Sequence, residues 1–222
     1  MESFLKQYCS AEWQEFIDFY KKNVEVKKNK TIFNVGDDTK GLYVVRSGKV
    51  KVLTKSIGNE QRLIRLASEG DILGHRGFGG NWTYPITAIA LEDTILTFIP
   101  LKAFNTITKS NNEFTYQLMM FFAEELRKSE DNSGALPVLN RVAKAIYENY
   151  LAFGYDKKDK NKLSFTLSRK DYASMCDTTY ESVIRSITAL AKNKIINTKN
   201  KDIYIVNLAE LKKMTEITAE NE

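Results

Sequence analysis

The residues with the most specific chemistry lie in one stretch near the C-terminal end, LSRKDYASMCDTTYESVIRSITALAKNKII (167–196). It places a carboxylate, Glu181, four residues before a guanidinium, Arg185. A guanidinium can donate two parallel hydrogen bonds to O6 and N7 of a guanine, whereas a carboxylate can accept one from the amino group of a cytosine. Residues four apart share a helix face, so this pair could read neighbouring base pairs in the major groove of DNA.

The same pair also has a structural interpretation. Near the start of a helix, Glu181 can act as an N2 or N3 residue that satisfies free backbone N–H groups, and Arg185 can pair with it one turn later. Spacing alone does not separate this role from base reading. The two roles differ in how the surrounding helices position the two side chains.

Two short helices joined by a tight turn are predicted around the pair. Ser168 followed by Asp171 has the form of a capping box and begins a first helix of about two turns. Thr178 or Thr179 can cap a second helix that ends near Asn193. Its buried side is expected to consist of Val183, Ile187, Leu190 and Ala191. The residues expected to face outward are Tyr180, Glu181, Ser182, Arg185 and Thr188 or Ala189.

The residues that follow complete a winged helix-turn-helix. INTK and IYIV flank Lys199-Asn200-Lys201-Asp202 and predict a two-stranded hairpin, after which 208–217 predicts a closing helix. In this motif the second helix enters the major groove, which makes Glu181, Arg185 and Tyr180 the candidate base contacts. The candidate phosphate contacts are hydroxyls at the helix starts and lysines beyond the second helix: Ser168, Thr178, Thr179, Ser182, Lys192, Lys194, Lys199 and Lys201.

Basic side chains are concentrated in the same part of the chain. Residues 137–215 carry 15 Lys and Arg against 8 Asp and Glu, whereas the first 136 residues carry 18 against 17. The field of such an excess attracts a polyanion such as DNA. The alternative is a solvated lysine-rich surface, which applies above all to the lysines of the loop 154–162 and to any single lysine of the hairpin.

The first half of the chain has the pattern of a β-sheet protein. Residues 3–22 carry apolar side chains at helical spacing and predict a short helical lead-in. Between Val24 and Pro100 the period changes to two, in short segments separated by glycine turns: TIFNV, GLYVVRSGKVKVLTK, QRLIRLA and TAIALEDTILTFI. Short strands at this spacing favour an antiparallel roll or sandwich.

The helical period returns at Leu101, and Asn111 or Asn112 can cap a long helix through about Asp131. Its apolar residues cover more than one face, so this helix needs two neighbours. One stripe can pack on the chain's own β-domain and the other on a second copy of the chain, as in a coiled coil; alternatively, both stripes belong to the core of one chain. The residues expected in this dimer helix are Phe114, Leu118, Phe121, Phe122 and Leu126.

Glycine and proline in the segment 132–137 mark a break between two domains. Pro137 suits the first turn of the next helix, which is predicted from Val138 to about Phe153. The expected fold class is α+β, with an N-terminal antiparallel β-roll (1–110), a long dimerisation helix and hinge (111–136) and a C-terminal winged helix-turn-helix (137–222).

The composition limits what else the chain can be. Its 222 residues are 43% hydrophobic and 27% charged, which excludes wholly disordered and collagen-like proteins. Two cysteines, Cys9 and Cys176, and one histidine supply too few ligands for an iron–sulfur cluster or a cysteine- or histidine-rich metal site. The apolar runs are too short to span a bilayer and the start lacks a secretory signal, so we expect a cytoplasmic protein without membrane contact.

Together, these motifs resemble the CRP/FNR family of bacterial transcription regulators over nearly the whole chain. The resemblance is carried by FNVGDDTKGLYVVRSGKVKVL, GDILG, TAIALEDTILTFIP and RVAKAI, and most specifically by ESVIR (181–185), which is similar to the family's recognition-helix core E-[ST]-V-x-R. It implies a β-roll of cyclic-nucleotide-binding fold, a dimer along the long helix, palindromic DNA sites, base reading by Glu181 and Arg185, and contact with RNA polymerase. Where many members have arginine before the glutamate this chain has Tyr180, so the resemblance does not give its half-site.

The effector side departs from the relatives that bind cyclic AMP. Those relatives hold the ribose with a glutamate and the cyclic phosphate with an Arg-Ser pair, where this chain has His75 and Tyr84-Pro85. A buried phosphate without its arginine loses a strong charge-assisted contact, so cyclic AMP in the usual pose is not expected. The segment 74–80 could present backbone amides and Arg76 to another anion; the alternative is a flexible glycine-rich loop. The candidate effector pocket consists of Gly74, His75, Arg76, Gly77 and Tyr84.

The effector and any cofactor stay open at this point. His75 could be an axial haem ligand, as in gas-sensing family members, but a lone loop histidine is more often structural or exposed. A small-molecule-binding module that acts on a protein partner is a second function, with the winged domain as its interaction surface. An enzyme ranks last, because the chain has no nucleophile–His–acid set and no GxxxxGK[ST] phosphate loop.

Overall fold

The computed structural model describes residues 10–55, 61–129 and 136–216. The chain divides into two units, one made of residues 1–59 and 67–131 and the other of residues 60–66 and 132–222. No helix within the described ranges is long and apolar enough to cross a membrane.

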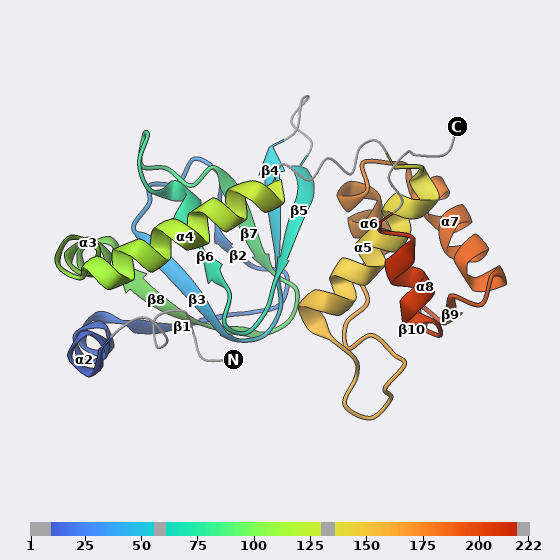
Figure 1. The fold of residues 1–222 in the computed structure, drawn as a ribbon, viewed down its shortest axis with the longest axis horizontal. Coiled ribbons are helices and arrows are strands. Elements are labelled where there is room, and N and C mark those ends of the chain that lie inside the picture. Colours follow the sequence, from blue (N-terminus) through green and yellow to red (C-terminus); the bar gives the residue numbers. More distant parts are fainter. Residues whose placement is uncertain (1–9, 56–60, 130–135, 217–222) are drawn as a thin grey trace. The chain divides into compact units, whose positions relative to one another are not determined.

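Two four-stranded sheets form the N-terminal β-roll (Figure 1). The strand order in the first sheet is β1 (Lys22–Val26), β8 (Thr94–Pro100), β3 (Gly41–Ser47) and β6 (Ile72–Leu73). The order in the second sheet is β2 (Thr31–Phe33), β7 (Ile86–Ala90), β4 (Val50–Lys55) and β5 (Gln61–Ala67). The pairs β3–β8 and β4–β7 run antiparallel, so the predicted antiparallel roll is confirmed.

The helical lead-in is shorter than predicted. Helix α2 spans Ala11–Tyr20, residues 3–9 of the prediction lie outside the described ranges, and the chain turns into β1 at Lys22. The sequence KNVEV is too short to show a period of its own, and its strand conformation comes from pairing with β8, where Val24 lies opposite Leu96. The two-residue strand β6 was not predicted either, because it is also too short to show a period, and its strand conformation comes from pairing with β3.

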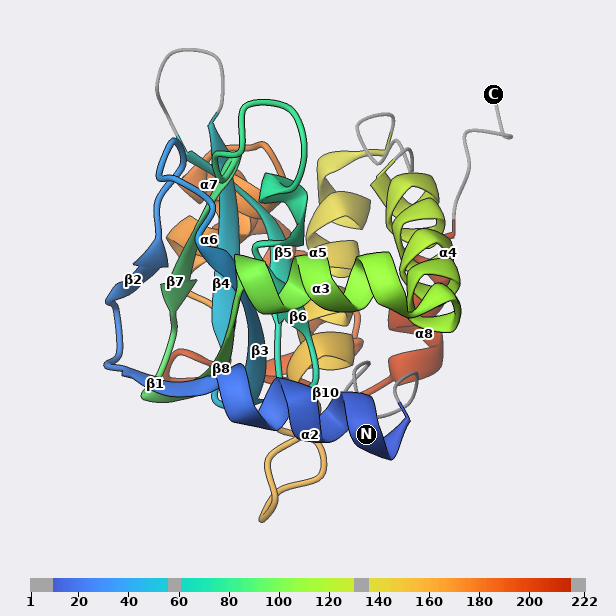
Figure 2. The same ribbon diagram turned by 90° about the vertical axis from the view of Figure 1, so that its left-hand side faces the viewer.

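The apolar residues of the β-roll form two layers of core. Between the two sheets lies a cluster of Phe33, Val45, Val50, Val52, Ala67, Leu73, Tyr84, Ile86, Ala88 and Leu96. The second cluster joins the outer face of the first sheet to α2, α3 (Leu101–Ser110) and α4 (Asn112–Ser129), which lie beside that sheet in Figure 2. Because the two sheets and these helices all bury apolar faces on one another, the position of α4 is tied to the β-roll.

Helix α4 begins as predicted, because the side-chain oxygen of Asn111 accepts a hydrogen bond from the backbone N–H of Phe114 (3.0 Å). The five residues expected in the dimer helix differ in their burial. Phe114 and Leu118 are buried in the core of their own chain, and Phe121 and Phe122 are partly buried against the same cluster. A side chain without exposed surface cannot form a seam, so of the five expected residues only Leu126 lies on the exposed face.

The winged unit follows its predicted order closely. Its elements are α5 (Val138–Phe153), α6 (Arg169–Met175), α7 (Tyr180–Lys192), β9 (Ile196–Lys199), β10 (Asp202–Ile205) and α8 (Leu208–Lys213). The hairpin strand β10 begins one residue earlier than the predicted IYIV, and α8 ends before the predicted residue 217. A buried polar contact ties α5 to α6: the amide Nδ2 of Asn149 donates to the hydroxyl of Tyr172 (2.8 Å) and to the carbonyl of Phe165 (3.0 Å).

We predict that Phe114→Ala lowers the free energy of unfolding by about 3 to 5 kcal/mol, because it removes a fully buried ring and leaves a cavity between α4 and the β-roll. Phe19→Ala is the matched control, since Phe19 is 81% exposed and its removal should cost less than about 0.5 kcal/mol. Denaturant unfolding followed by circular dichroism measures both values. Equal losses for the two variants would contradict the inward placement of Phe114.

Candidate nucleic-acid interface

Helix α7 presents one polar face and buries the other. The hydroxyl of Thr179, not Thr178, caps the helix by accepting a hydrogen bond from the backbone N–H of Ser182 (3.2 Å). The buried side consists of Val183, Ser186, Ile187 and Leu190, of which Ser186 was not expected. The exposed residues on the opposite side are Tyr180, Glu181, Ile184, Arg185 and Thr188. Both members of the predicted base-reading pair therefore project from the open face.

Only one part of the structural interpretation of that pair is seen, because Glu181 lies in the first turn of α7 but Arg185 bonds elsewhere. Arg185 Nη2 donates to the hydroxyl oxygen of Ser182 at 3.3 Å, on the side towards the helix start. Among the described residues, no hydrogen bond or ion pair joins it to Glu181. Glu181 stays in the first turn, where its negative charge is favourable next to the helix N-terminus, and its carboxylate is exposed. Both charged groups are available to a ligand.

The predicted phosphate contacts divide into two groups. Thr179 and Ser182 lie at the N-terminus of α7, where free backbone N–H groups favour an anion, and their hydroxyls are hydrogen-bonded to one another (3.0 Å). Ser168 is occupied within its own capping box, because its hydroxyl donates to Asp171 Oδ2 (2.6 Å). Four predicted lysines are exposed, at or just beyond the end of α7 and in the hairpin: Lys192, Lys194, Lys199 and Lys201. Thr178 is half-buried in the turn.

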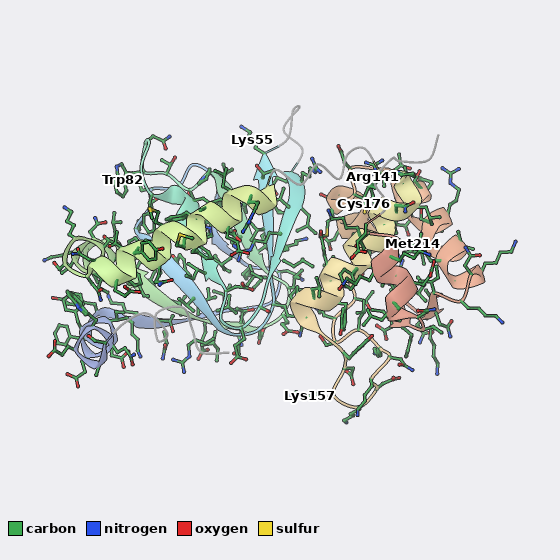
Figure 3. All side chains as sticks on the ribbon, in the orientation of Figure 1. Lys55, Trp82, Arg141, Lys157, Cys176 and Met214 are labelled. Atoms are coloured by element: carbon green, nitrogen blue, oxygen red, sulfur yellow. The ribbon has the colours of Figure 1, made fainter. Side chains whose placement is uncertain are left out.

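The turn between α6 and α7 is held by a residue of α5. Arg141 Nη1 donates to the carbonyl oxygens of Cys176 (2.7 Å) and Asp177 (3.2 Å), and the thiol of Cys176 donates back to the carbonyl of Arg141 (3.4 Å). Figure 3 shows Arg141 and Cys176 next to one another near the start of α5. Asp177 has a φ of 50°, a left-handed conformation that reverses the chain between the helices. The guanidinium thus fixes the turn that sets the direction of α7.

The side chain of Cys176 is buried, so its thiol is not accessible to reagents in solution. Burial raises the pKa of its thiol to about 12, against the smaller opposing effect of the Arg141 charge. The thiol therefore stays protonated and acts as a weak hydrogen-bond donor in the turn.

Sequence reasoning missed Arg141 and Ile184. Arg141 lies in the motif RVAKAI, but nothing in the local sequence connects it to a carbonyl 35 residues away. Ile184 reads as a core residue by its type, but its helical position puts it between Glu181 and Arg185 on the exposed face. The helical position of Ile184 relative to the buried residues Val183 and Ile187 is the sequence feature that could have predicted its exposure.

The candidate effector pocket is closed by the chain's own side chains. Tyr84 lies in the core between the sheets, stacked on Phe33 with ring centroids 4.1 Å apart, and its hydroxyl donates to the carbonyl of Gly41 (2.7 Å). Burial raises the pKa of Tyr84 to about 12. The hydroxyl of Thr39 donates to the carbonyl of Gly77 (3.0 Å), and a Cβ on Gly77 would lie 2.3 Å from that hydroxyl. Tyr84 and Gly77 are therefore packed together with the core instead of lining an open site.

His75 and Arg76 connect this segment to α4. The segment Gly74–Gly77 is packed as a short 3₁₀ turn over His75–Gly77, not a loose loop, with His75 buried and Arg76 exposed. The ring of His75 meets that of Phe121 edge-on, with centroids 5.3 Å apart. Oε2 of Glu125, on α4, lies 3.9 Å from His75 Nε2 and 3.8 Å from Arg76 Nη2.

In the described ranges, no group of three or more His, Cys, Asp or Glu side chains could hold a metal ion.

We predict that Arg141→Ala lowers the free energy of unfolding of the winged unit by about 2 to 3 kcal/mol, because two carbonyls lose a charged donor. DNA affinity should fall as well, since the direction of α7 is no longer fixed. The control is Lys144→Ala on the same helix, which should change neither quantity measurably. Thermal unfolding and a DNA titration measure the two effects; a variant with unchanged stability would contradict the role of Arg141.

Comparison with protein families assigns both parts of the chain. Residues 23–111 match the cyclic nucleotide-binding domain, and residues 140–214 match the Crp-like helix-turn-helix domain. The fumarate and nitrate reduction regulatory protein of Vibrio cholerae is 24% identical over 199 residues, which cover 88% of this chain and 79% of that protein. The anaerobic regulatory protein of Aggregatibacter actinomycetemcomitans is 26% identical over 192 residues, covering 84% and 73%.

Solved structures agree on the fold. FixK2 from Bradyrhizobium japonicum superposes with a TM-score of 0.77 at 19% identity, covering 90% of this chain and 99% of that one. A CRP/FNR-family transcriptional regulator from Thermus thermophilus gives a TM-score of 0.68 at 21% identity, covering 88% and 99%. Both domain matches, the homologous regulators and the helix-turn-helix that exposes Glu181 and Arg185 agree: the chain belongs to the CRP/FNR family of DNA-binding transcription regulators.

Proposed function

We propose that this regulator binds palindromic DNA as a homodimer, with α7 of each protomer in the major groove and with Glu181 and Arg185 on base edges. The single observation that carries the proposal is the exposed charged pair on the open face of α7, whose members do not bond to one another. Arg185 would read a guanine and Glu181 a cytosine, while Thr179, Ser182, Lys192, Lys199 and Lys201 would hold the phosphates. A duplex selected from random DNA with the purified chain tests the proposal, which requires an enriched two-fold symmetric sequence.

Dimerisation is proposed along the outer face of α4. Four large apolar side chains are exposed there, with 48 to 62% of each residue accessible: Tyr116, Met119, Met120 and Leu126. Tyr116 and Met119 are three residues apart and Leu126 follows Met119 by seven, with the exposed Ala123 between them, so together they form one helical stripe, as a coiled-coil seam requires. Of the five residues expected in the dimer helix, Leu126 belongs to this seam. Two helices paired in this way would give the dimer a two-fold axis, and a palindromic site then requires the two α7 helices to lie one DNA turn, about 34 Å, apart.

The β-roll is proposed as the regulatory domain. Its interior is filled at Tyr84 and Gly77, and no arginine stands where the cyclic phosphate of cyclic AMP would be bound, which supports a signal other than cyclic AMP in the usual pose. His75 and Arg76 meet α4 at Glu125, so a change in this segment would act on the dimer helix.

The expected hinge at 134–137 lies partly outside the described residues. Contact with RNA polymerase and action in the cytoplasm are proposed on the family resemblance.

The alternative function, a module that acts on a protein partner, is not favoured. The Crp-like helix-turn-helix model covers residues 140–214, and the homologous proteins are regulators. A DNA affinity that falls steeply with added salt would agree with phosphate neutralisation, whereas salt-insensitive binding to a protein would favour the alternative.

We expect Arg185→Ala to weaken binding to the selected site by about 1 to 3 kcal/mol and to relax the preference at one base pair in each half-site. The loss comes from the two hydrogen bonds that no other side chain supplies to that base. A fluorescence titration with the selected duplex and single-base variants measures both effects. Arg127→Ala, an exposed arginine of α4, is the control that should retain affinity; full affinity and preference in Arg185→Ala would refute the assignment.

We expect Met119→Glu to raise the dimer dissociation constant at least about tenfold, because two carboxylates would meet at the two-fold axis in an apolar seam. Phe19→Glu is the matched control, since Phe19 is also apolar and exposed but lies on α2. Sedimentation equilibrium measures both constants. A dimer of unchanged strength in Met119→Glu would place the seam elsewhere.

A further inference from the structure

The open face of α7 carries an apolar ridge that the paired charges do not explain. Tyr180, Ile184 and Thr188 follow one another at intervals of four residues, and all three are exposed, Tyr180 at 47% and Ile184 at 39%. This ridge runs directly beside the ridge of Glu181 and Arg185, because the two sets are offset by one residue. An apolar strip therefore lies next to the polar groups that are proposed to read bases.

Ile184 has no place in the core of the winged unit. Its neighbours Val183 and Ile187 are buried at 0% and 5% exposure, and they already provide the packing of α7 on the rest of the unit. Ile184 lies about 100° around the helix from Val183, at the edge of the buried side, and 39% of the residue stays exposed. That exposed part is buried only when something covers the open face of α7.

Thr188 adds to the apolar character of the ridge. Its hydroxyl donates to the carbonyl of Ile184 at 2.9 Å, so its polar group is engaged within the helix and its methyl group is left for the outer surface. Tyr180 contributes an aromatic ring at the other end, close to the helix start. From Tyr180 to Thr188 the ridge extends about 12 Å along α7.

The largest apolar group on the base edges in the major groove is the 5-methyl group of thymine. Apart from small C–H groups such as C5–H of cytosine, the other groups there are hydrogen-bond donors and acceptors. An isoleucine pressed on such donors and acceptors would leave them without partners, whereas contact with a methyl group buries apolar surface on both sides. The ridge therefore selects for thymine at the position that it covers.

We propose that Ile184 is a specificity-determining residue that packs on the methyl group of a thymine in each half-site, with Tyr180 beside it. This inference rests on the proposed function, in which α7 enters the major groove. Because Ile184 directly precedes Arg185 and follows Glu181 by three residues, this thymine lies within about two base pairs of the guanine and cytosine that the charged pair reads.

Replacing single thymines by uracil in the selected duplex tests the proposal, because uracil keeps every hydrogen-bonding group of thymine and lacks only the methyl group. With the full chain, uracil at one position of a half-site should lower affinity about fourfold, and at both symmetric positions about fifteenfold. In Ile184→Ala the same replacement should have no effect, while the preferences at the guanine and cytosine persist. Leu151→Ala, an exposed leucine of the same unit outside α7, is the matched control and should keep the full response to uracil.

Three outcomes would contradict the proposal in distinguishable ways. If the chain binds a selected sequence and uracil is tolerated at every position, Ile184 reads no methyl group, although the proposed function stands. If Ile184→Ala keeps the response to uracil, another side chain reads the methyl group. If the chain selects no sequence at all, the proposed function fails together with this inference. Circular dichroism and thermal unfolding of Ile184→Ala show whether the variant is folded, as its exposure leads us to expect.

Discussion

The hydrogen bonds from Arg141 to the turn between α6 and α7 are the constraint on which the candidate DNA interface depends. The chain enters α7 through a reversal at Asp177, a residue in a left-handed conformation that a side chain adopts at some cost. Two carbonyls of that reversal point at one guanidinium on α5. Because α5 is fixed to α6 through Asn149 and Tyr172, the three helices set one direction for the exposed face of α7.

The polar and apolar residues of that face have different tasks. Glu181 and Arg185 supply charges that desolvate on entering a groove, which is costly unless matching groups are met there, and this cost is what gives such residues their power to discriminate. In the proposed interface, Ile184 and Tyr180 would discriminate by the opposite principle, since apolar side chains gain from contact with an apolar group and lose when placed on a polar one. A surface with both kinds of residue can distinguish more base sequences than either kind alone.

In the β-roll, packing decides how a signal could be received. The interior of the β-roll is filled at Tyr84, which is stacked on Phe33 and hydrogen-bonded to Gly41. The segment 75–77 is pressed on α4 instead, with His75 on Phe121 and near Glu125. Helix α4 thus buries one face on the β-roll and leaves the other exposed, so the element that would sense a change in the β-roll is also the element proposed to join two protomers.

The sequence by itself determined the fold class, the order of most elements and the placement of Glu181 and Arg185 on one face of a helix, because these follow from local spacing, capping residues and period. Helix α5 and the cap of α6 at Ser168 are found where the local pattern predicts them. The tertiary structure alone decided which stripe of α4 is buried, because Phe114 and Leu126 are both strongly apolar and only the neighbouring sheet distinguishes them. It also decided that β1 is a strand, that Arg141 holds a turn 35 residues away and that Tyr84 fills the β-roll. Each of these depends on a partner far away in the chain, and no local pattern contains that information.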